Sequence, residues 1–299
     1  MKNSVHTETC PRSVIRRAIV VAVQLSLAVA TLVHAQRSVM PNAAGSLKFA
    51  IIGDNGTGEK PQYEVAGQMV ELHKQFAFDL VLMLGDNFYG SQRPADLEKK
   101  FGLPYKPLLD AGVRFRASLG NHDQIATINY SPIGMDGQRY YTYARNNVRF
   151  FALDTNALDQ KQLTWFEGAL QNAKEDWKIP YFHHPIYGNG GRHGGAADLR
   201  VRLEPLFLKY GVQIVFSGHD HVYERLKPQK GILYFVMGSS GQLRRGNLER
   251  SESTAAGFDQ DRAFMVGEIA GDRFNFQVIS RTGATVDSGE FRRPANSGN

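Results

Sequence analysis

The sequence predicts an α/β fold, and three observations lead to this prediction. Five short apolar runs, typical of buried strands, each end in a loop rich in polar residues. Segments with helical spacing of apolar residues lie between several of these runs. From residue 232 onward the chain is mostly strand-like. Alternating strands and helices followed by hairpins favour a mixed sheet, with a second sheet formed by the later strands.

The first kind of strand is expected where apolar residues run together and a turn signal follows. The apolar run at 80–84, followed by Gly85 and Asp86, is the clearest example. Strands of this kind are expected at 47–52, 79–84, 113–119, 177–182 and 212–216. Further strands lie in a hairpin and in the C-terminal part: 139–144 and 148–153 around a turn at 145–147, then 232–237, 263–270 and 273–280.

Helices are expected where apolar residues recur three and four positions apart, as Leu163, Phe166 and Leu170 do. By this criterion the helices span 64–74, 160–173 and 197–210. A stretch at 97–109 is partly helical, and we expect Pro104 and Pro107 to break it. The eight residues at 188–195 include five glycines and are expected to form a mobile loop.

The N-terminus has the pattern of an export signal, and we expect cleavage after residue 35. A basic stretch precedes a largely apolar segment at 18–33, and a small residue stands at the cleavage point. The apolar segment is short for a membrane span. We therefore expect a periplasmic or extracellular protein with no membrane span after cleavage. The pair Arg16-Arg17 leaves the twin-arginine route open beside the general secretory route.

The remaining chain has no internal repeat and no second domain boundary. We expect a linker at 36–46 that is disordered or extended, one catalytic domain at 47–292, and a flexible tail at 293–299. The chain of 299 residues has a formal net charge of +6, but its first 35 residues hold four basic and one acidic residue, which leaves +3. This mild charge suits a small anionic substrate better than nucleic acid, and we expect a monomer. The only cysteine, Cys10, lies in the signal, so no disulfide or thiolate site is expected after it.

Residues of metal-ligand type gather in the loops after the five strands. Because the carboxyl ends of parallel strands meet at one edge of a sheet, these loops are expected to converge. The candidate metal ligands are Asp54, Asp86, Tyr89, Asn121, His183, His219 and His221. Mixed nitrogen and oxygen ligands suit Fe, Zn or Mn, and a phenolate suits Fe(III). One central carboxylate among seven candidates indicates two metals that share Asp86, an arrangement that clamps an in-line displacement at phosphorus.

In order, the loops read Gly-Asp-Asn-Gly from residue 53, Gly-Asp-Asn-Phe-Tyr from 85, Gly-Asn-His-Asp from 120, His-His-Pro from 183 and Gly-His-Asp-His from 218. This set resembles the calcineurin-like metallophosphoesterases, and Tyr89 narrows the resemblance to the purple acid phosphatases, closest to the small, tartrate-resistant type. The resemblance implies a four-layer α/β/β/α sandwich with two mixed sheets. It also implies an Fe(III) site of Asp54, Asp86, Tyr89 and His221, and a divalent Fe, Zn or Mn site of Asp86, Asn121, His183 and His219.

The implied activity is that of an acid phosphatase acting on phosphate monoesters. A metal-bound hydroxide would attack phosphorus in line, while the metals and His122 neutralise the equatorial oxygens. His122 or His193 would protonate the departing alkoxide. Substrate contacts are expected from His122, His193, His184 and Asn87. For His184, His193 and Asn87 the alternatives are a packing role, an exposed loop position and a hydrogen bond within the loop.

Other functions remain open from the sequence. A phosphodiesterase or nucleotidase would use the same active-site residues, because specificity lies in the loops that shape the pocket. A non-hydrolytic iron-binding or redox protein would not need His122. A nucleic-acid or surface-binding protein with a vestigial site would be expected to carry more positive charge than +3.

Overall fold

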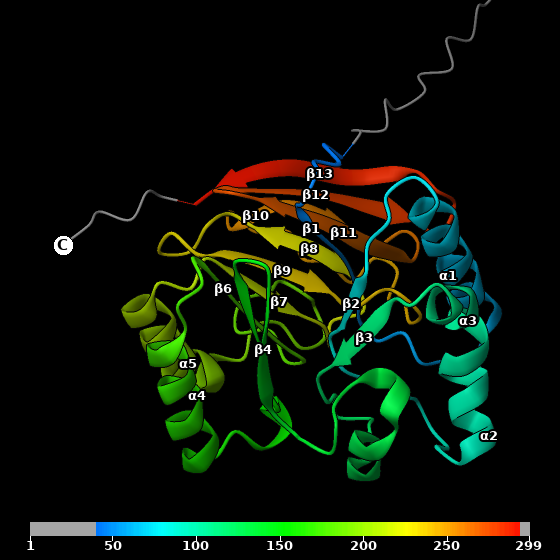
Figure 1. The fold of residues 1–299 in the computed structure, drawn as a ribbon, viewed down its shortest axis with the longest axis horizontal. Helices are drawn as coiled ribbons and strands as arrows, with labels where there is room; N and C mark the ends of the chain where they lie inside the picture. Colours follow the sequence, from blue (N-terminus) through cyan, green and yellow to red (C-terminus); the bar gives the residue numbers. More distant parts are fainter. Residues whose placement is uncertain (1–39, 294–299) are drawn as a thin grey trace, which may run out of the picture. The chain divides into compact units, whose positions relative to one another are not determined.

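The computed structural model describes residues 40–293, so the expected signal, the start of the linker and residues 294–299 of the tail lie outside the described residues. In the described part, two mixed β-sheets pack face to face and helices cover their outer faces (Figure 1). This arrangement confirms the predicted α/β/β/α sandwich. Within residues 40–293, no helix combines the length and apolar character that crossing a membrane requires.

The first sheet has the strand order β13-β12-β11-β1-β2-β3. Its strands are β1 (Leu47–Ile52), β2 (Leu80–Met83), β3 (Arg114–Ala117), β11 (Ala263–Ala270), β12 (Arg273–Ser280) and β13 (Thr285–Arg292). Strands β1, β2 and β3 run parallel, with Phe49 opposite Leu80 and Leu80 opposite Arg114. The loops that follow these three strands therefore leave the sheet at the same edge.

The second sheet has the strand order β10-β8-β9-β7-β6-β5-β4. Its strands are β4 (Tyr141–Arg145), β5 (Val148–Ala152), β6 (Trp177–Phe182), β7 (Ile214–Ser217), β8 (Tyr223–Leu226), β9 (Leu233–Met237) and β10 (Thr254–Phe258). Strands β5, β6, β7 and β9 are parallel, and the other pairs are antiparallel. The loops after β6 and β7 thus also emerge together.

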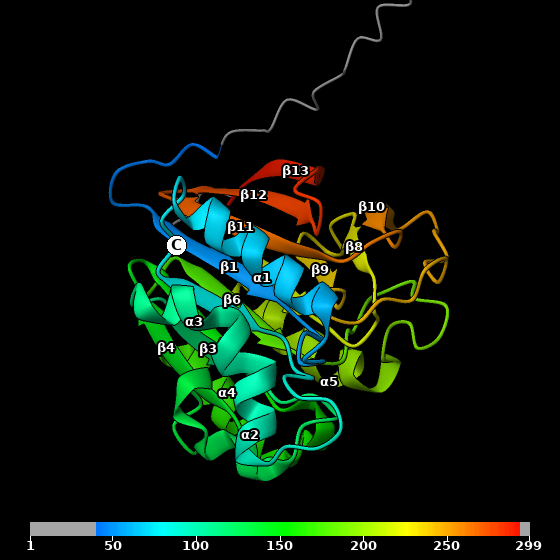
Figure 2. The ribbon, with the colours of Figure 1, turned by 90° about the vertical axis from the view of Figure 1, so that its right-hand side faces the viewer.

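Aromatic side chains fill the space between the two sheets. Phe49 of β1 packs edge-on against Phe150 and Phe216 of the second sheet, with ring centroids 5.7 and 6.3 Å apart. On the outer face of the first sheet lie α1 (Lys60–His73), α2 (Pro94–Leu97) and α3 (Leu103–Asp110), with α1 running along β1 and β11 (Figure 2). Helices α4 (Gln160–Asn172) and α5 (Ala197–Tyr210) cover the second sheet.

Several elements differ from the expectation. The stretch at 97–109 is not broken: α2 runs through a π-helical turn (Glu98–Gly102) into α3. Both prolines lie inside this continuous helix, and burial of Tyr105 and Leu108 outweighs the hydrogen bonds that Pro104 and Pro107 cannot donate. Strands β8, β10 and β13 were not expected, because they are short or rich in polar residues and form through pairing with neighbours.

Part of the expected linker is held against the domain. The backbone N–H groups of Asn42 and Ala43 donate to the Glu268 carboxylate at 2.8 and 2.6 Å, and the Ser46 hydroxyl donates to the same group at 2.6 Å. Glu268 is fully buried in β11, so its charge needs these donors. Residues 42–46 are therefore ordered by a long-range contact that no local pattern indicates.

Candidate metal centre

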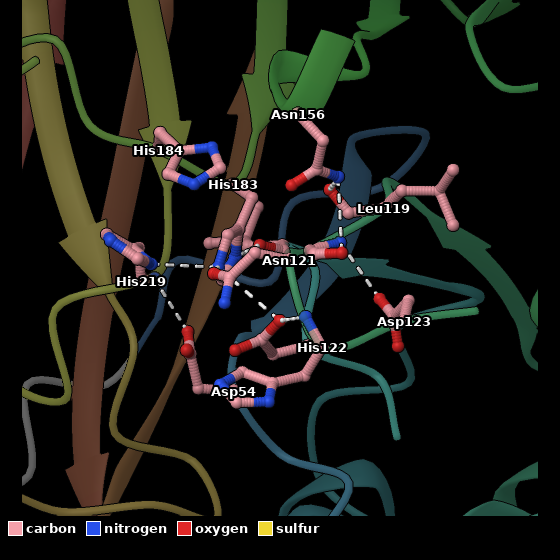
Figure 3. Close-up of polar contacts among 12 residues, drawn as sticks. Asp54, Leu119, Asn121, His122, Asp123, Asn156, His183, His184 and His219 are labelled. Carbon is pink, nitrogen blue, oxygen red and sulfur yellow. Dashed lines mark hydrogen bonds and ion pairs between the residues drawn. The ribbon is translucent and has the colours of Figure 1, made fainter. Parts of the chain in front are cut away.

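Five loops from the two sheets meet at one edge of the sandwich. Asp54, Asp86 and Asn121 follow β1, β2 and β3 of the first sheet. His183 follows β6, and His219 and His221 follow β7 of the second sheet. Figure 3 shows His183, Asn121 and His219 pointing toward one another from these loops. The structure thus brings together the side chains that the sequence placed at strand ends.

Three of these residues have left-handed backbone conformations at their strand ends. The φ angles of Asp54, Asp86 and His219 are 51°, 49° and 71°. Non-glycine residues in this region cost about 1–3 kcal/mol each when the surroundings hold them there. Gly120 relieves the crowding around Asp86, since a β-carbon at Gly120 would overlap the Asp86 backbone and carboxylate. The strained backbone positions are therefore the ones that carry ligand-type side chains.

The first group of ligand-type atoms comes from Asp54, Asp86 and His221, whose candidate atoms lie within 4.8 Å of one another. Tyr89 joins this group, because its phenol oxygen lies 3.0 Å from Asp54 Oδ1 and 3.1 Å from His221 Nε2. His221 Nε2 also lies 3.3 Å from Asp54 Oδ1. Carboxylate, phenol and imidazole atoms therefore converge on one point.

The second group comes from His183, His184 and His219, again with candidate atoms within 4.8 Å. His183 Nε2 lies 3.0 Å from Asn121 Oδ1 and 3.1 Å from His219 Nδ1. It also lies 3.5 Å from Asp86 Oδ1, so Asp86 connects the two groups. Asp54 adds a second connection, because its Oδ2 accepts the backbone N–H of His219 at 2.8 Å.

The hydrogen bonds of His183 test whether these atoms fit a cation. Its Nδ1 lies 2.9 Å from the carbonyl oxygen of Leu84, which can only accept, so the ring proton belongs on Nδ1. Nε2 then directs a lone pair at the oxygens of Asn121 and Asp86, which are acceptors in this arrangement. Asp86 Oδ2 is buried and has no hydrogen-bond partner among the described residues. Converging lone pairs with an orphaned carboxylate oxygen fit a bound cation.

Burial shifts the pKa values of this centre toward neutral side chains. Burial, with the nearby Asp86 charge, raises the pKa of Asp54, and burial with both carboxylates raises the pKa of Tyr89. Burial lowers the pKa of His183, and with the neighbouring histidines it lowers that of His219 to about 2. Burial and Arg244 lower the pKa of His221 to about 4. The imidazoles thus keep free lone pairs, while the oxygen ligands need a positive partner to stay ionised.

The two predicted catalytic histidines lie at the exposed side of the centre. The backbone N–H of His122 donates to Asp86 Oδ1 at 2.8 Å, and the His122 ring packs 4.7 Å from the ring of Tyr89. The ring of His193 lies 4.1 Å from that of His219. Both side chains are exposed to solvent and border ligand-type residues. Either side chain can therefore meet a substrate that enters from solvent.

The remaining predicted substrate contacts have different surroundings. His184 Nδ1 lies 2.9 Å from the Thr155 hydroxyl, and its ring lies 4.5 Å from the His219 ring, so it belongs to the second group rather than to the core. Asn87 is fully buried. Its side-chain N–H groups donate to the Ser118 carbonyl and to Asp123 Oδ2, both at 2.8 Å. This position favours the hydrogen bond within the loop over contact with a substrate.

Comparison with known proteins agrees with this geometry. Residues 47–223 match the calcineurin-like phosphoesterase family model. This chain belongs to the calcineurin-like phosphoesterase family. The match covers β1 to the start of β8 and includes every candidate metal ligand. The phosphoesterase resembles tartrate-resistant acid phosphatase type 5 of Rattus norvegicus, which is 29% identical over 66% of this chain and 73% of the relative. It also resembles purple acid phosphatase 17 of Arabidopsis thaliana, at 26% identity over 71% and 74%.

Solved structures show the same fold at lower identity. A purple acid phosphatase from yellow lupin (Lupinus luteus) seeds superposes with a TM-score of 0.67 and 17% identity, covering 85% of this chain and 55% of that one. GAP50, described as the anchor in the inner membrane complex of Plasmodium, superposes with a TM-score of 0.71 and 20% identity, covering 84% and 90%. These likenesses establish the fold of the phosphoesterase domain.

Asp123 joins two of the ligand loops of this phosphoesterase. Its carboxylate accepts the backbone N–H groups of Gly120 and Phe88, both at 2.9 Å, and of Asn87 at 3.1 Å. Burial raises the Asp123 pKa to about 7. Its hydrogen bonds go to the backbone of the loops that carry Asp86 and Asn121, and to the side-chain amide of Asn87.

Sequence reasoning missed Arg244, which lies beside the first group. Its backbone N–H donates to the His221 carbonyl at 3.0 Å, and its side-chain Nε donates to His221 Nδ1 at 3.3 Å. No carboxylate lies within ion-pair distance of Arg244 in the described part of the chain. The only local signal was the pair Arg244-Arg245 in a loop, which is common on protein surfaces.

The glycine loop at 188–195 is tied down at its base. The buried carboxylate of Glu224 accepts the backbone N–H and the side-chain amide of Asn189, both at 2.7 Å, and the Thr254 hydroxyl at 2.6 Å. The Gly191 N–H donates to the Asn247 carbonyl at 2.6 Å. A β-carbon at Gly190 would overlap the Asp220 carboxyl group beneath it. These contacts fix the approach of the loop that carries His193, although its composition alone predicted a mobile loop.

Proposed function

We propose that this phosphoesterase is an exported acid phosphatase that hydrolyses phosphate monoesters at a centre of two metal ions. The observation that carries the proposal is the position of Asp86 between the two groups of ligand-type atoms, with one oxygen orphaned in a buried site. The sequence similarity to tartrate-resistant acid phosphatases supports the monoesterase assignment. The fold alone does not support hydrolysis, since a protein described as an anchor shares it.

We assign the ligands by motif and by proximity. Fe(III) would be held by Asp54, Asp86, Tyr89 and His221, and divalent Fe, Zn or Mn by Asp86, Asn121, His183 and His219. When bound, two such cations lower the pKa of water and neutralise charge on phosphoryl oxygens. Tyr89 favours Fe(III) in the first position, because only a strongly charged cation offsets the burial and the two carboxylates that raise its pKa.

The chain's own residues supply the proton and the binding contacts. His122 is exposed and is held against Asp86 through its backbone N–H, so its imidazole is placed to donate a proton to the leaving alkoxide. His193 lies next to His219 of the second group and contributes a second donor to the phosphoryl oxygens. Arg244 adds positive charge beside His221 and His193, which favours an anionic substrate.

The test combines metal content, the visible spectrum and a pH–rate profile of the purified protein. We expect about two metals per chain, a purple band, an acidic optimum on a simple aryl phosphate, and slower turnover of the matching aryl diester. The Asp86→Ala variant serves as the control without the bridging ligand. Two metals without colour would contradict the Tyr89–Fe(III) assignment, and metal with colour but no turnover of either ester would overturn the phosphatase proposal.

A further inference from the structure

A cavity of about 700 Å³ adjoins the second group of ligand-type residues. Asn121 and His184 line both this cavity and the metal centre, so the two spaces are continuous. Apart from these two residues, the lining comes from the loops after β3 and β5, from Arg139 and from the start of α5. A phosphoryl group at the metal centre would therefore have its ester substituent within reach of the cavity.

The one arginine of the cavity wall has its charge balanced. The Arg139 side chain donates from Nε at 2.7 Å and from Nη2 at 2.6 Å to Oδ2 of Asp154. Asp154 is 2% exposed and also accepts from the backbone and side chain of Asn156 at 3.0 Å. A guanidinium paired in this way with a buried carboxylate adds little net positive charge to the cavity.

Two further carboxylates lie in the wall: Asp123, which accepts three backbone N–H groups, and Asp198, which is not balanced. Asp198 lies in the first turn of α5, is exposed, and has no ion pair or side-chain hydrogen bond among the described residues. Asp198 and His184 line the same cavity, so the Asp198 carboxylate faces the space beside the second group. The cavity therefore carries a net negative charge close to the metal centre.

The rest of the wall contributes apolar surface. Ile125, in the loop after β3, is 55% exposed and lines the cavity. Leu119 and Leu199 complete the apolar wall. A carbon skeleton can pack on these side chains, while Asp198 can pair with a positive group.

We propose that this cavity is the leaving-group subsite and selects phosphate esters of neutral or cationic alcohols with an apolar skeleton, such as amino alcohols, over esters with a second anionic group. This inference rests on the proposed phosphatase function. A second phosphate or a carboxylate in the cavity would face Asp198 without an unpaired cation to offset the repulsion. A cationic substituent would gain from the same carboxylate.

The opposite orientation is the competing arrangement. Arg192 directly precedes His193 in the chain, and Arg244 donates to His221, so an anionic leaving group could be received on that side. The cavity thus favours a neutral or cationic leaving group, whereas the arginine side favours an anionic one. A comparison of esters that differ only in charge separates them.

The experiment uses the metal-loaded protein at low ionic strength with three aryl phosphates: the 4-(aminomethyl)phenyl, 4-(hydroxymethyl)phenyl and 4-(carboxymethyl)phenyl esters. The methylene group keeps the charge away from the ring, so the leaving groups have similar reactivity. We expect kcat/KM to fall from the cationic to the neutral to the anionic ester. The ratio of kcat/KM for the cationic ester to that for the anionic ester should be about threefold to tenfold, the size of one partly exposed charge interaction. Added salt should lower this ratio.

Two variants assign the preference to the cavity. Asp198→Asn should bring the ratio of the two kcat/KM values close to one. Asp272→Asn makes an equal change of charge in an exposed turn at the far end of β11 and should leave this ratio unchanged. If Asp198→Asn destabilises α5, Ile125→Lys provides a second test, because this exposed position tolerates substitution and the added cation should favour the anionic ester.

The outcomes are distinct. Turnover of all three esters without a charge preference overturns the subsite while the phosphatase proposal stands. Preference for the anionic ester that is lost in Arg244→Met places the leaving group on the arginine side and also overturns the subsite. No turnover of any ester rejects the proposed function, and the inference with it.

Discussion

The phenol oxygen of Tyr89 lies 3.1 Å from Nε2 of His221, although the two residues come from loops on different sheets. Tyr89 follows β2 and His221 follows β7. Their contact closes the first ligand group around Asp54. Packing of one sheet on the other thus completes a candidate metal centre that neither sheet contains alone.

Replacement of Tyr89 by Phe tests the iron assignment. The ring is kept, so the packing against His122 should survive, but the phenol oxygen is lost. We expect the visible band to disappear or shift strongly, because the colour requires a phenolate on Fe(III). Absorption spectra and metal analysis provide the measurement. Tyr63→Phe, which removes only a surface hydrogen bond to Lys99, is the matched control, and an unchanged spectrum in Tyr89→Phe would remove Tyr89 from the ligands.

Replacement of Asp86 by Asn should have opposite effects on stability with and without metal. In the metal-free protein, the change removes a buried charge next to Asp54 and should raise the melting temperature, with a gain in the free energy of unfolding of about 1–3 kcal/mol. In metal-loaded preparations the variant should be less stable than the wild type, because ligand binding stabilises the native state. Calorimetry with and without chelator measures both. A lower melting temperature of the metal-free variant contradicts this account.

Replacement of His122 by Ala separates catalysis from metal binding. The contact with Asp86 uses the backbone N–H of His122, which Ala retains, so metal content and colour should stay the same. Loss of a positioned proton donor should lower kcat by about 10²–10⁴-fold. Steady-state kinetics beside metal analysis checks this, with His73→Ala in helix α1 as control. Full activity would exclude the proposed role of His122.

Glu224 should act on the rate through the loop that carries His193. Glu224→Gln turns one acceptor into a donor where Asn189 and Thr254 both donate, which should destabilise the protein by about 1–3 kcal/mol. If the carboxylate serves to position His193, Glu224→Gln should lower kcat/KM when it is made in the wild-type protein. The same change made in the His193→Ala variant should cause no further loss of kcat/KM. A double-mutant cycle measures this coupling. Independent, additive losses would mean that Glu224 affects the centre by another route.

The ion pair between Arg149 and Glu175, far from the candidate metal centre, should contribute to the pH dependence of the free energy of unfolding. Burial alone would raise the pKa of Glu175, but hydrogen bonds from Arg149 at 2.7 and 3.0 Å hold it below its usual 4.5. A lowered pKa stabilises the fold above pH 4.5 and loses this effect as the pH falls through the lowered value. Glu175→Gln should therefore cost about 0.5–1 kcal/mol at neutral pH and progressively less in acid. Melting temperatures across pH measure this, and Glu71→Gln, in an exposed pair with Lys74, is the control. A loss that stays constant down to acid pH would contradict it.

Much of the fold and of the ligand set could be predicted from the sequence. Apolar runs that end in Gly-Asp or Gly-Asn mark buried parallel strands, and such strands place their carboxyl-end loops at one edge. Asp54, Asp86 and Asn121 were predictable neighbours for that reason. The prediction was weaker for strands β8, β10 and β13, which depend on pairing more than on their own composition.

Other features depended on contacts between distant segments. Asn87 belongs to a ligand loop, yet its side chain is buried and bonded to Ser118 and Asp123. His184 follows a ligand, yet it lies within the second group because Thr155 holds its Nδ1. Neither position follows from the spacing of residues, since the direction of a side chain in an irregular loop depends on its long-range partners.

The sequence by itself determined the candidate metal ligands of this protein, their order along the chain, and the strands whose ends carry them. This information is local, because hydrophobic runs and turn residues specify strands and loops within a few positions. Only the tertiary structure decided which other side chains surround the centre, including Arg244 beside His221 and Asp198 in the adjoining cavity. These positions follow from the packing of two sheets and from long loops. No short sequence pattern specifies which residues that are distant in the chain become neighbours in the folded protein.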